Sequence, residues 1–161
     1  MVYEKDKIDF KVLDNSNCRL IKALQQDKYT RNWNEEEIEH LLNKGGGHGL
    51  IIYFSKNPIG YCFFRNLMDE VEILSLEIKS KYRNKGLGSL LFKKIELYFV
   101  DKKIHRCFLE VNENNNLAID FYKKIGFVYI KNIKNYYKIN NSYQDGLLLQ
   151  KITHLDMNYK S

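Results

Sequence analysis

The chain contains seven short stretches in which apolar side chains alternate with polar ones or run together, a pattern typical of β-strands. In the first stretch, Ile8, Phe10 and Val12 occupy every second position. Lys56-Asn57-Pro58, between the second and third stretches, has the composition of a turn. The predicted strands cover residues 8–13, 50–54, 59–64, 71–78, 105–111, 127–130 and 147–152.

Apolar residues at helical spacing predict four helices between these strands. Ser16 or Asn17 is expected to cap the first helix, and Asn34-Glu35-Glu36-Glu37 has the pattern of a capping box for the second. The second helix is predicted to end at Gly45-Gly46-Gly47 and the fourth at Gly126, as helices commonly do at glycine. The expected buried faces are Leu20, Ile21 and Leu24; Ile38, Leu41 and Leu42; Leu87, Leu90, Leu91, Ile95 and Tyr98; and Ala118, Phe121, Tyr122 and Ile125.

The order of these elements predicts an α/β fold with a mixed central sheet and helices on both faces. A length of 161 residues suits a single domain spanning residues 1–161. The tail after Thr153 is polar and is expected to be frayed. The repeats, linkers and composition shifts that would divide the chain into two domains are not found in the sequence.

Composition narrows the classes of function. The net charge is +6, which suits either a nucleic-acid binder or a solvated surface with a site for an anionic cofactor. We favour the cofactor, because the basic residues are spread along the chain without a basic arm. The 3 cysteines are scattered, and the 4 histidines lack metal-ligand spacing, so we expect no metal site. Neither a signal peptide nor a membrane span is recognisable, and we expect a cytoplasmic protein.

The segment Tyr82 to Leu91 carries candidate chemistry, because a glycine-rich turn there joins a predicted strand to a predicted helix. Such a turn presents backbone N–H groups and a helix N-terminus to one point, which favours phosphate. Neither familiar phosphate loop fits: a P-loop would need Lys and Ser or Thr directly after Gly86, and a dinucleotide fingerprint would need glycine at Leu91. The remaining pattern is Arg-x-x-Gly-x-Gly, which could also be an ordinary tight connection.

A second motif follows an apolar stretch that ends in Phe108-Leu109-Glu110-Val111. It reads Asn-x-x-Ala-x-x-Phe-Tyr-x-x-x-Gly-Phe and covers residues 115–127. The two motifs in this order resemble the GNAT acetyltransferase superfamily. Leu109-Glu110-Val111, Asn115, Tyr122, Asn135-Tyr136-Tyr137 and Asp145-Gly146 further resemble its RimI branch. That branch acetylates protein N-termini, typically that of a small-subunit ribosomal protein.

The resemblance implies acetyl-CoA as cofactor, coenzyme A as product, and two catalytic residues. Glu110 would be the general base, directly or through a water, and Tyr122 the general acid that protonates the leaving thiolate. The structural alternatives are a strand-end glutamate paired with Lys or Arg, and a core tyrosine. The implied cofactor-binding residues, besides Tyr122, include Leu76, Glu77 and Ile78, whose backbone groups would pair with the pantetheine arm. The others are Arg83, Asn84, Lys85, Gly86, Leu87, Gly88, Ser89 and Asn115.

The acceptor is the least defined part of this interpretation. A weakly activating base favours α-amines, whose pKa is about 7.7–8.0, over lysines at about 10.4. A protein N-terminus is therefore the expected acceptor, with a small amine such as a polyamine or an aminoglycoside as the alternative. A non-catalytic acyl-CoA-binding regulator is a further alternative. Trp33, Tyr136 and Tyr137 are the candidate walls of a peptide groove, or else simple packing.

Overall fold

Seven strands and four α-helices make up most of the computed structural model, which describes residues 5–153. The strands are β1 (Ile8–Val12), β2 (Gly47–Phe54), β3 (Asn57–Leu67), β4 (Glu70–Ile78), β5 (Arg106–Asn112), β6 (Val128–Ile139) and β7 (Ser142–Ile152). The α-helices are α1 (Cys18–Leu24), α2 (Glu35–Lys44), α3 (Leu87–Asp101) and α4 (Asn116–Lys124). Short 3₁₀ helices cover Lys5–Lys7, Asn15–Asn17 and Ser80–Tyr82. The predicted tail after Thr153 lies outside the described residues.

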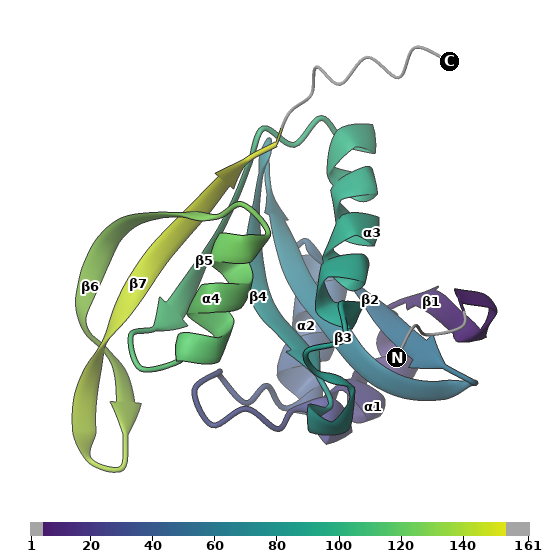
Figure 1. Ribbon diagram of the computed structural model, residues 1–161, viewed down its shortest axis with the longest axis horizontal. Coiled ribbons are helices and arrows are strands. Elements are labelled where there is room, and N and C mark those ends of the chain that lie inside the picture. Colours follow the sequence, from purple (N-terminus) through teal and green to yellow (C-terminus); the bar gives the residue numbers. More distant parts are fainter. Residues whose placement is uncertain (1–4, 154–161) are drawn as a thin grey trace.

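The strands form one mixed sheet in the order β1-β2-β3-β4-β5-β7-β6. The pair β4–β5 is parallel, whereas the other neighbours are antiparallel. Pairing between β4 and β5 ends at Ile73 and Leu109, although β4 continues to Ile78 and β5 to Asn112. The sheet therefore opens between these two strands in their second halves (Figure 1).

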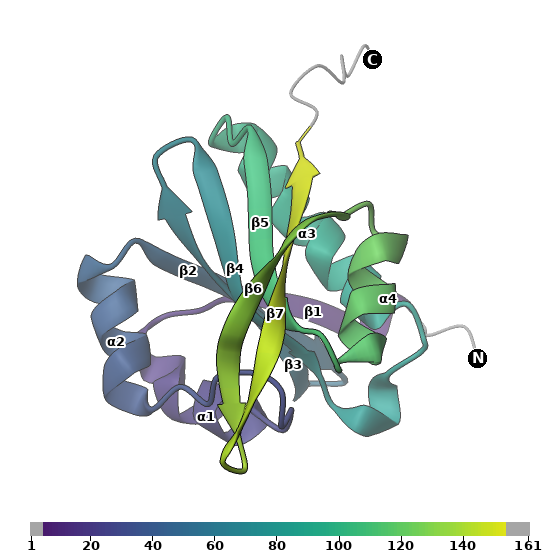
Figure 2. The same cartoon turned by 90° about the vertical axis from the view of Figure 1, so that its left-hand side faces the viewer.

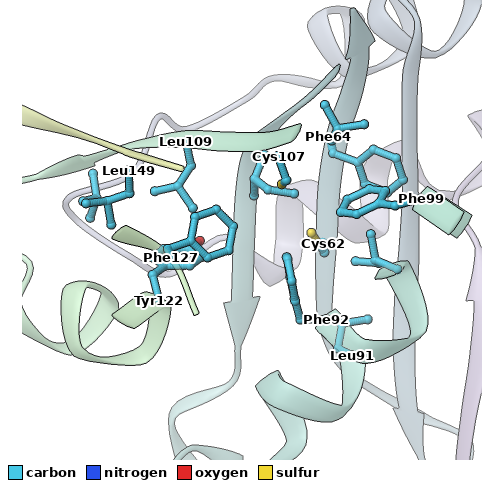
Figure 3. Packing of buried hydrophobic residues seen from close by; sticks show 14 of the residues in the cluster. Cys62, Phe64, Leu91, Phe92, Phe99, Cys107, Leu109, Tyr122, Phe127 and Leu149 are labelled. Atoms are coloured by element: carbon cyan, nitrogen blue, oxygen red, sulfur yellow. The ribbon is translucent and has the colours of Figure 1, made fainter. Parts of the chain in front are cut away.

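Helices cover both faces of the sheet, as predicted from the sequence. α3 and α4 lie on one face, and α1 and α2 lie on the other (Figures 1 and 2). Phe92, Phe99, Cys62 and Cys107 belong to the larger buried cluster, on the α3 side (Figure 3). The smaller cluster, on the α1 and α2 side, includes Ile21, Ile38, Trp33, Tyr61 and Phe63. The fold is thus two apolar layers separated by the sheet.

Two predicted helix starts have different outcomes. The Asn34 capping box is confirmed, because Asn34 Oδ1 accepts a hydrogen bond from Glu37 N at 2.8 Å and Glu37 Oε2 accepts one from Asn34 N at 3.0 Å. Asn17, one of the two predicted caps, is the N-cap residue of α1, but its side chain makes no capping hydrogen bond to the helix. A 3₁₀ turn precedes that helix instead, and Asp14 caps this turn by accepting from Ser16 N at 2.8 Å. The sequence pattern thus predicts the helix but not the turn before it.

The turns and the last hairpin also differ from the prediction. Ser55 and Lys56, with φ of 47° and 66°, make the turn from β2 to β3, so Asn57 and Pro58 already belong to β3. The strands β6 and β7 extend far beyond 127–130 and 147–152, and they meet at Asn140 and Asn141. Most of β6 is exposed, so its outer half lacks the apolar alternation by which strands are recognised.

Candidate active site

A cleft occupies the opening between β4 and β5, with an empty volume of about 410 Å³ that includes its mouth to solvent. The two strands, α4, β6 and the loop between α1 and α2 all contribute to its walls. The lining residues are Asp27, Tyr29, Thr30, Ile73, Leu74, Ser75, Leu76, Leu109, Glu110, Val111, Asn112, Asn115, Ala118, Tyr122 and Tyr137. Two of them, Asp27 and Glu110, are charged and both are acidic, which favours a cationic occupant such as an amine.

A β-bulge in β4 prepares the wall that faces this cleft. Leu74 is unpaired at the register shift against β3, where Phe63 pairs with Ser75 and Phe64 with Ile73. The extra residue lets Ile73 and Leu76 both pack on the α3 side of the sheet. Because no β4–β5 pair follows Ile73, the β5-facing main chain of Leu76 to Ile78 is open to pairing with an extended ligand, except at the Ile78 carbonyl, which accepts from Arg83 Nε. The main chain implied by the resemblance is therefore suitably placed, and Leu76 itself lines the cleft.

The glycine-rich turn lies at the start of α3. Gly86 is the N-cap residue, with φ of 78° and no side-chain cap, so the first N–H groups of α3 lack intrahelical partners. A Cβ built at Gly86 would meet nothing within 4 Å, so the space beside it is open. At Gly88 a Cβ would lie 3.1 Å from the Phe121 ring, so this glycine serves the packing of α3 on α4.

Arg83 and Lys85 flank this turn. Arg83 Nε donates to the carbonyl of Ile78 at 2.7 Å, which ties the turn to the end of β4. Lys85 Nζ donates to the carbonyl of Lys81 at 2.8 Å. Open space, free N–H groups and two nearby cations match what a pyrophosphate requires. Arg83, Asn84, Lys85, Gly86, Leu87, Gly88 and Ser89 therefore fit a site for the phosphates of acetyl-CoA.

Tyr122 projects from α4 into the buried core beside the cleft (Figure 3). Its side chain is 7% exposed and packs at 5.4 Å between ring centroids on Phe127. Burial raises the pKa of its phenol well above the usual value, so the group is protonated at neutral pH. Within residues 5–153 its hydroxyl has no hydrogen-bond partner, which leaves the proton free for a ligand in the cleft.

Glu110 lies on β5 and is half-buried at the cleft. The hydroxyl of Tyr136 donates a hydrogen bond to its Oε2. Burial, together with this bond to Glu110, raises the pKa of Tyr136 to about 12. The ion pairs found among residues 5–153 do not include Glu110, so the alternative of a strand-end glutamate paired with Lys or Arg is not observed.

A second bulge, in β6, directs two tyrosines toward the site. The register against β7 shifts between Ile133 and Tyr137, and Asn135 has φ of 51°. Asp145 Oδ1 accepts from Asn135 N at 3.0 Å and thereby holds the bulge. Tyr136 then reaches Glu110, while Tyr137 lines the cleft. Asp145 is thus a support of the site rather than a part of it.

The Gly146→Ala variant tests this support. A Cβ at Gly146 would lie 3.1 to 3.3 Å from three atoms of Tyr136, so this side chain must shift by a few tenths of an ångström, which disturbs its hydrogen bond to Glu110. Because small displacements at a reacting centre are costly, we expect turnover to fall about tenfold or more. The measurement is steady-state acetylation, with Tyr136→Phe as the comparison that removes the same hydrogen bond without crowding. Unchanged turnover in Gly146→Ala would show that the position of Tyr136 does not matter.

The remaining predicted residues have other positions. Asn115 is buried, caps α4 by accepting from Ala118 N at 3.3 Å, and lines the cleft. Trp33 does not reach the cleft; it is 8% exposed and packs edge-on against Phe63 in the smaller apolar cluster. Sequence reasoning assigns no role to Asp27, Tyr29 and Thr30, which also line the cleft. Their sequence is that of an ordinary polar loop and carries no signal of a site.

Comparisons with known proteins agree with this geometry. The model of the acetyltransferase (GNAT) family matches residues 18–127. The ribosomal protein bS18-alanine N-acetyltransferase of Haemophilus influenzae is 33% identical over an alignment of 128 positions, which covers 73% of this chain and 87% of that protein.

Solved structures show the same fold. The ribosomal-protein-S18-alanine N-acetyltransferase of Escherichia coli aligns with a TM-score of 0.81 at 16% identity, covering 91% of this chain and 94% of that one. The spermidine/spermine N-acetyltransferase SpeG of Vibrio cholerae aligns with a TM-score of 0.75 at 19% identity, covering 97% of this chain and 98% of that one. The chain therefore belongs to the acetyltransferase (GNAT) family, and it is an acetyl-transferring enzyme that uses acetyl-CoA.

Proposed function

We propose that this enzyme acetylates the α-amine of a protein N-terminus, in keeping with relatives that are named ribosomal protein bS18-alanine N-acetyltransferases. The observation that carries the proposal is the placement of Glu110 and Tyr122 around one cleft whose charged lining residues are both acidic. An acceptor amine must lose a proton, and the leaving thiolate must gain one. The cleft offers a carboxylate for the first step and a protonated phenol for the second.

Each residue of the cleft would have one role in the reaction. Glu110 accepts a proton from the acceptor amine, directly or through a water, and the neutral nitrogen attacks the thioester carbonyl. The new C–N bond forms as the C–S bond breaks, and Tyr122 gives its proton to the sulfur. The extra proton on the new amide nitrogen leaves to solvent, and the Tyr122 phenolate takes a proton back from solvent. The main-chain N–H near Ile78 faces the opened sheet and is the candidate donor to the carbonyl oxygen. Arg83 to Ser89 hold the pyrophosphate.

Acetylation of a small polycation is the second candidate, favoured by the acidic lining and by the likeness to the fold of a spermidine/spermine N-acetyltransferase. A small polycation and a peptide would need different groups in the binding site. Multiple ammonium groups need several carboxylates, whereas an N-terminus needs one cation site and a groove for the following residues. Tyr29 and Tyr137 at the cleft suit a peptide chain better. A regulator that binds acyl-CoA without turnover would have no use for Glu110 and Tyr122 in this arrangement.

A panel of acceptors separates these proposals. The protein and acetyl-CoA are incubated with peptides bearing free N-termini, with the same peptides blocked at the N-terminus but carrying a free lysine, with spermidine and with an aminoglycoside. We expect mass spectrometry to find acetyl groups on free α-amines, since about a tenth of them are neutral at pH 7 against well under a thousandth of lysines. Acetylation of spermidine or the aminoglycoside instead would contradict the proposal. Bound acetyl-CoA with no product would favour the regulator.

A further inference from the structure

The side chain of Glu77 takes no part in the proposed reaction, yet it is buried. Glu77 belongs to β4, where the resemblance assigned only its main chain to the cofactor. The residue is 4% exposed, and its carboxylate lies on the α1 side of the sheet. Burial of a carboxylate in a protein is costly unless its oxygens are hydrogen-bonded. The partners of this group therefore indicate what it stabilises.

Four donors converge on this carboxylate. Oε2 accepts from the backbone N of Gln26 at 2.7 Å and of Asp27 at 3.1 Å. Oε1 accepts from Thr30 Oγ1 at 3.3 Å and from the hydroxyl of Tyr61 at 3.2 Å. Tyr61, on the neighbouring strand β3, is fully buried and also bonds Ser75 at 2.8 Å, so this end of the network is rigid. Three of the four donors belong to the loop between α1 and α2.

That loop forms one wall of the cleft. Asp27, Tyr29 and Thr30 line the cleft, and all three lie within the segment bound to Glu77. Asp27 Oδ1 accepts from Tyr29 N at 2.9 Å, and its Oδ2 accepts from Asn115 Nδ2 at 3.3 Å. The loop is therefore joined to the sheet through Glu77 and to the start of α4 through Asn115.

We propose that Glu77 is a positioning residue that fixes the α1–α2 loop as the acceptor wall and acts on the acceptor through Asp27. The inference rests on the proposed function, because it assumes an amine acceptor in this cleft. Among the described residues, Asp27 is the one charged group that the loop brings to the lining, and a carboxylate with two bonds can still accept from a cationic amine. Glu77 itself does not line the cleft, so it does not act as the base.

The Glu77→Gln variant tests the proposal, because glutamine keeps the size of the side chain but loses the charge and one acceptor oxygen. We expect the KM for the acceptor peptide to rise about 10- to 100-fold, the usual effect of losing hydrogen bonds to a charged group. The KM for acetyl-CoA should stay within about twofold of the parent value, since Arg83 to Ser89 are untouched. Glu70→Gln is the matched control, because Glu70 is on the same strand and pairs with Arg106 instead.

Hydrogen exchange gives a readout that needs no acceptor. The amides of Gln26 and Asp27 should exchange faster in Glu77→Gln than in the parent, whereas those of β3 and β4 should not change. Unchanged exchange at Gln26 and Asp27 would overturn the proposal whatever the acceptor proves to be. Faster exchange with an unchanged acceptor KM would overturn the link to the acceptor. If the parent enzyme acetylated no peptide at its α-amine, that result would count against the proposed function instead.

A double variant tests whether Glu77 acts through Asp27. If it does, Asp27→Asn and Glu77→Gln should not be additive, and the acceptor KM of the double variant should be close to that of the more affected single variant. Independent action predicts that the two fold-changes multiply. Multiplied effects would overturn the proposed route through Asp27.

Discussion

Replacing Glu110 by glutamine (E110Q) should lower turnover by about 10²–10⁴-fold at saturating acceptor and acetyl-CoA, the usual contribution of a general base. Glutamine cannot accept the amine proton, but its amide oxygen can still accept the hydrogen bond from Tyr136. The change therefore removes the base and keeps the local geometry. The measurement is steady-state kcat on the best peptide of the acceptor panel, together with the affinity for acetyl-CoA.

The control for E110Q is again Glu70→Gln, which removes a carboxylate of β4 that pairs with Arg106 away from the cleft. This variant should keep parental turnover. A pH series adds a second criterion: if Glu110 is the base, raising the pH should partly restore E110Q, because more of the acceptor is already neutral. Parental kcat in E110Q at neutral pH would rule out the role as base.

Replacing Tyr122 by phenylalanine (Y122F) should also lower kcat by about 10²–10⁴-fold, because it deletes the proton donor for the leaving thiolate. The ring contact with Phe127 is retained, and within residues 5–153 the hydroxyl bonds to no other group. Stability and the affinity for acetyl-CoA should therefore be close to parental. The measurement pairs kcat with the melting temperature, so that loss of chemistry is not confused with loss of fold.

Tyr98→Phe is the matched control for Y122F. The Tyr98 hydroxyl accepts from Asn66 Nδ2, so its removal costs a hydrogen bond but does not touch the cleft. This control should lose some stability and keep its turnover, which is the opposite pattern. If Y122F kept parental kcat and Tyr98→Phe did not, the assignment of the acid would be wrong.

The part of the site that can be predicted from the sequence is the part built from local motifs. Gly86 marks the turn because glycine, which lacks a Cβ, adopts a positive φ without steric cost, and this residue is the N-cap of α3. Glu110 and Tyr122 follow from a family resemblance in which each residue has a fixed distance from such a motif. The sheet and its covering helices follow from apolar periodicity, which is strong wherever a face is buried.

The rest depends on contacts between distant segments. Asp27 becomes part of the cleft only because Glu77, 50 residues later, binds its backbone N–H. Tyr136 reaches Glu110 because a bulge, held by Asp145, changes the direction of β6. The sequence predicts Trp33 at the groove as an aromatic near the acceptor side, yet apolar burial against Phe63 determines its position. Neither the spacing of residues nor the composition of the chain predicts these contacts between distant segments.

Because β4 and β5 separate, the proposed binding of acetyl-CoA would depend in part on backbone groups of β4. Backbone groups of Leu76 to Ile78 cannot be removed by exchanging side chains, so substitutions of the apolar Leu76 and Ile78 act only by how well they pack. These backbone groups are exposed to a ligand only because the pairing of β4 with β5 stops at Ile73 and Leu109. A change anywhere in the chain that added one more pair to this ladder would close the site, even if every residue facing the ligand were kept.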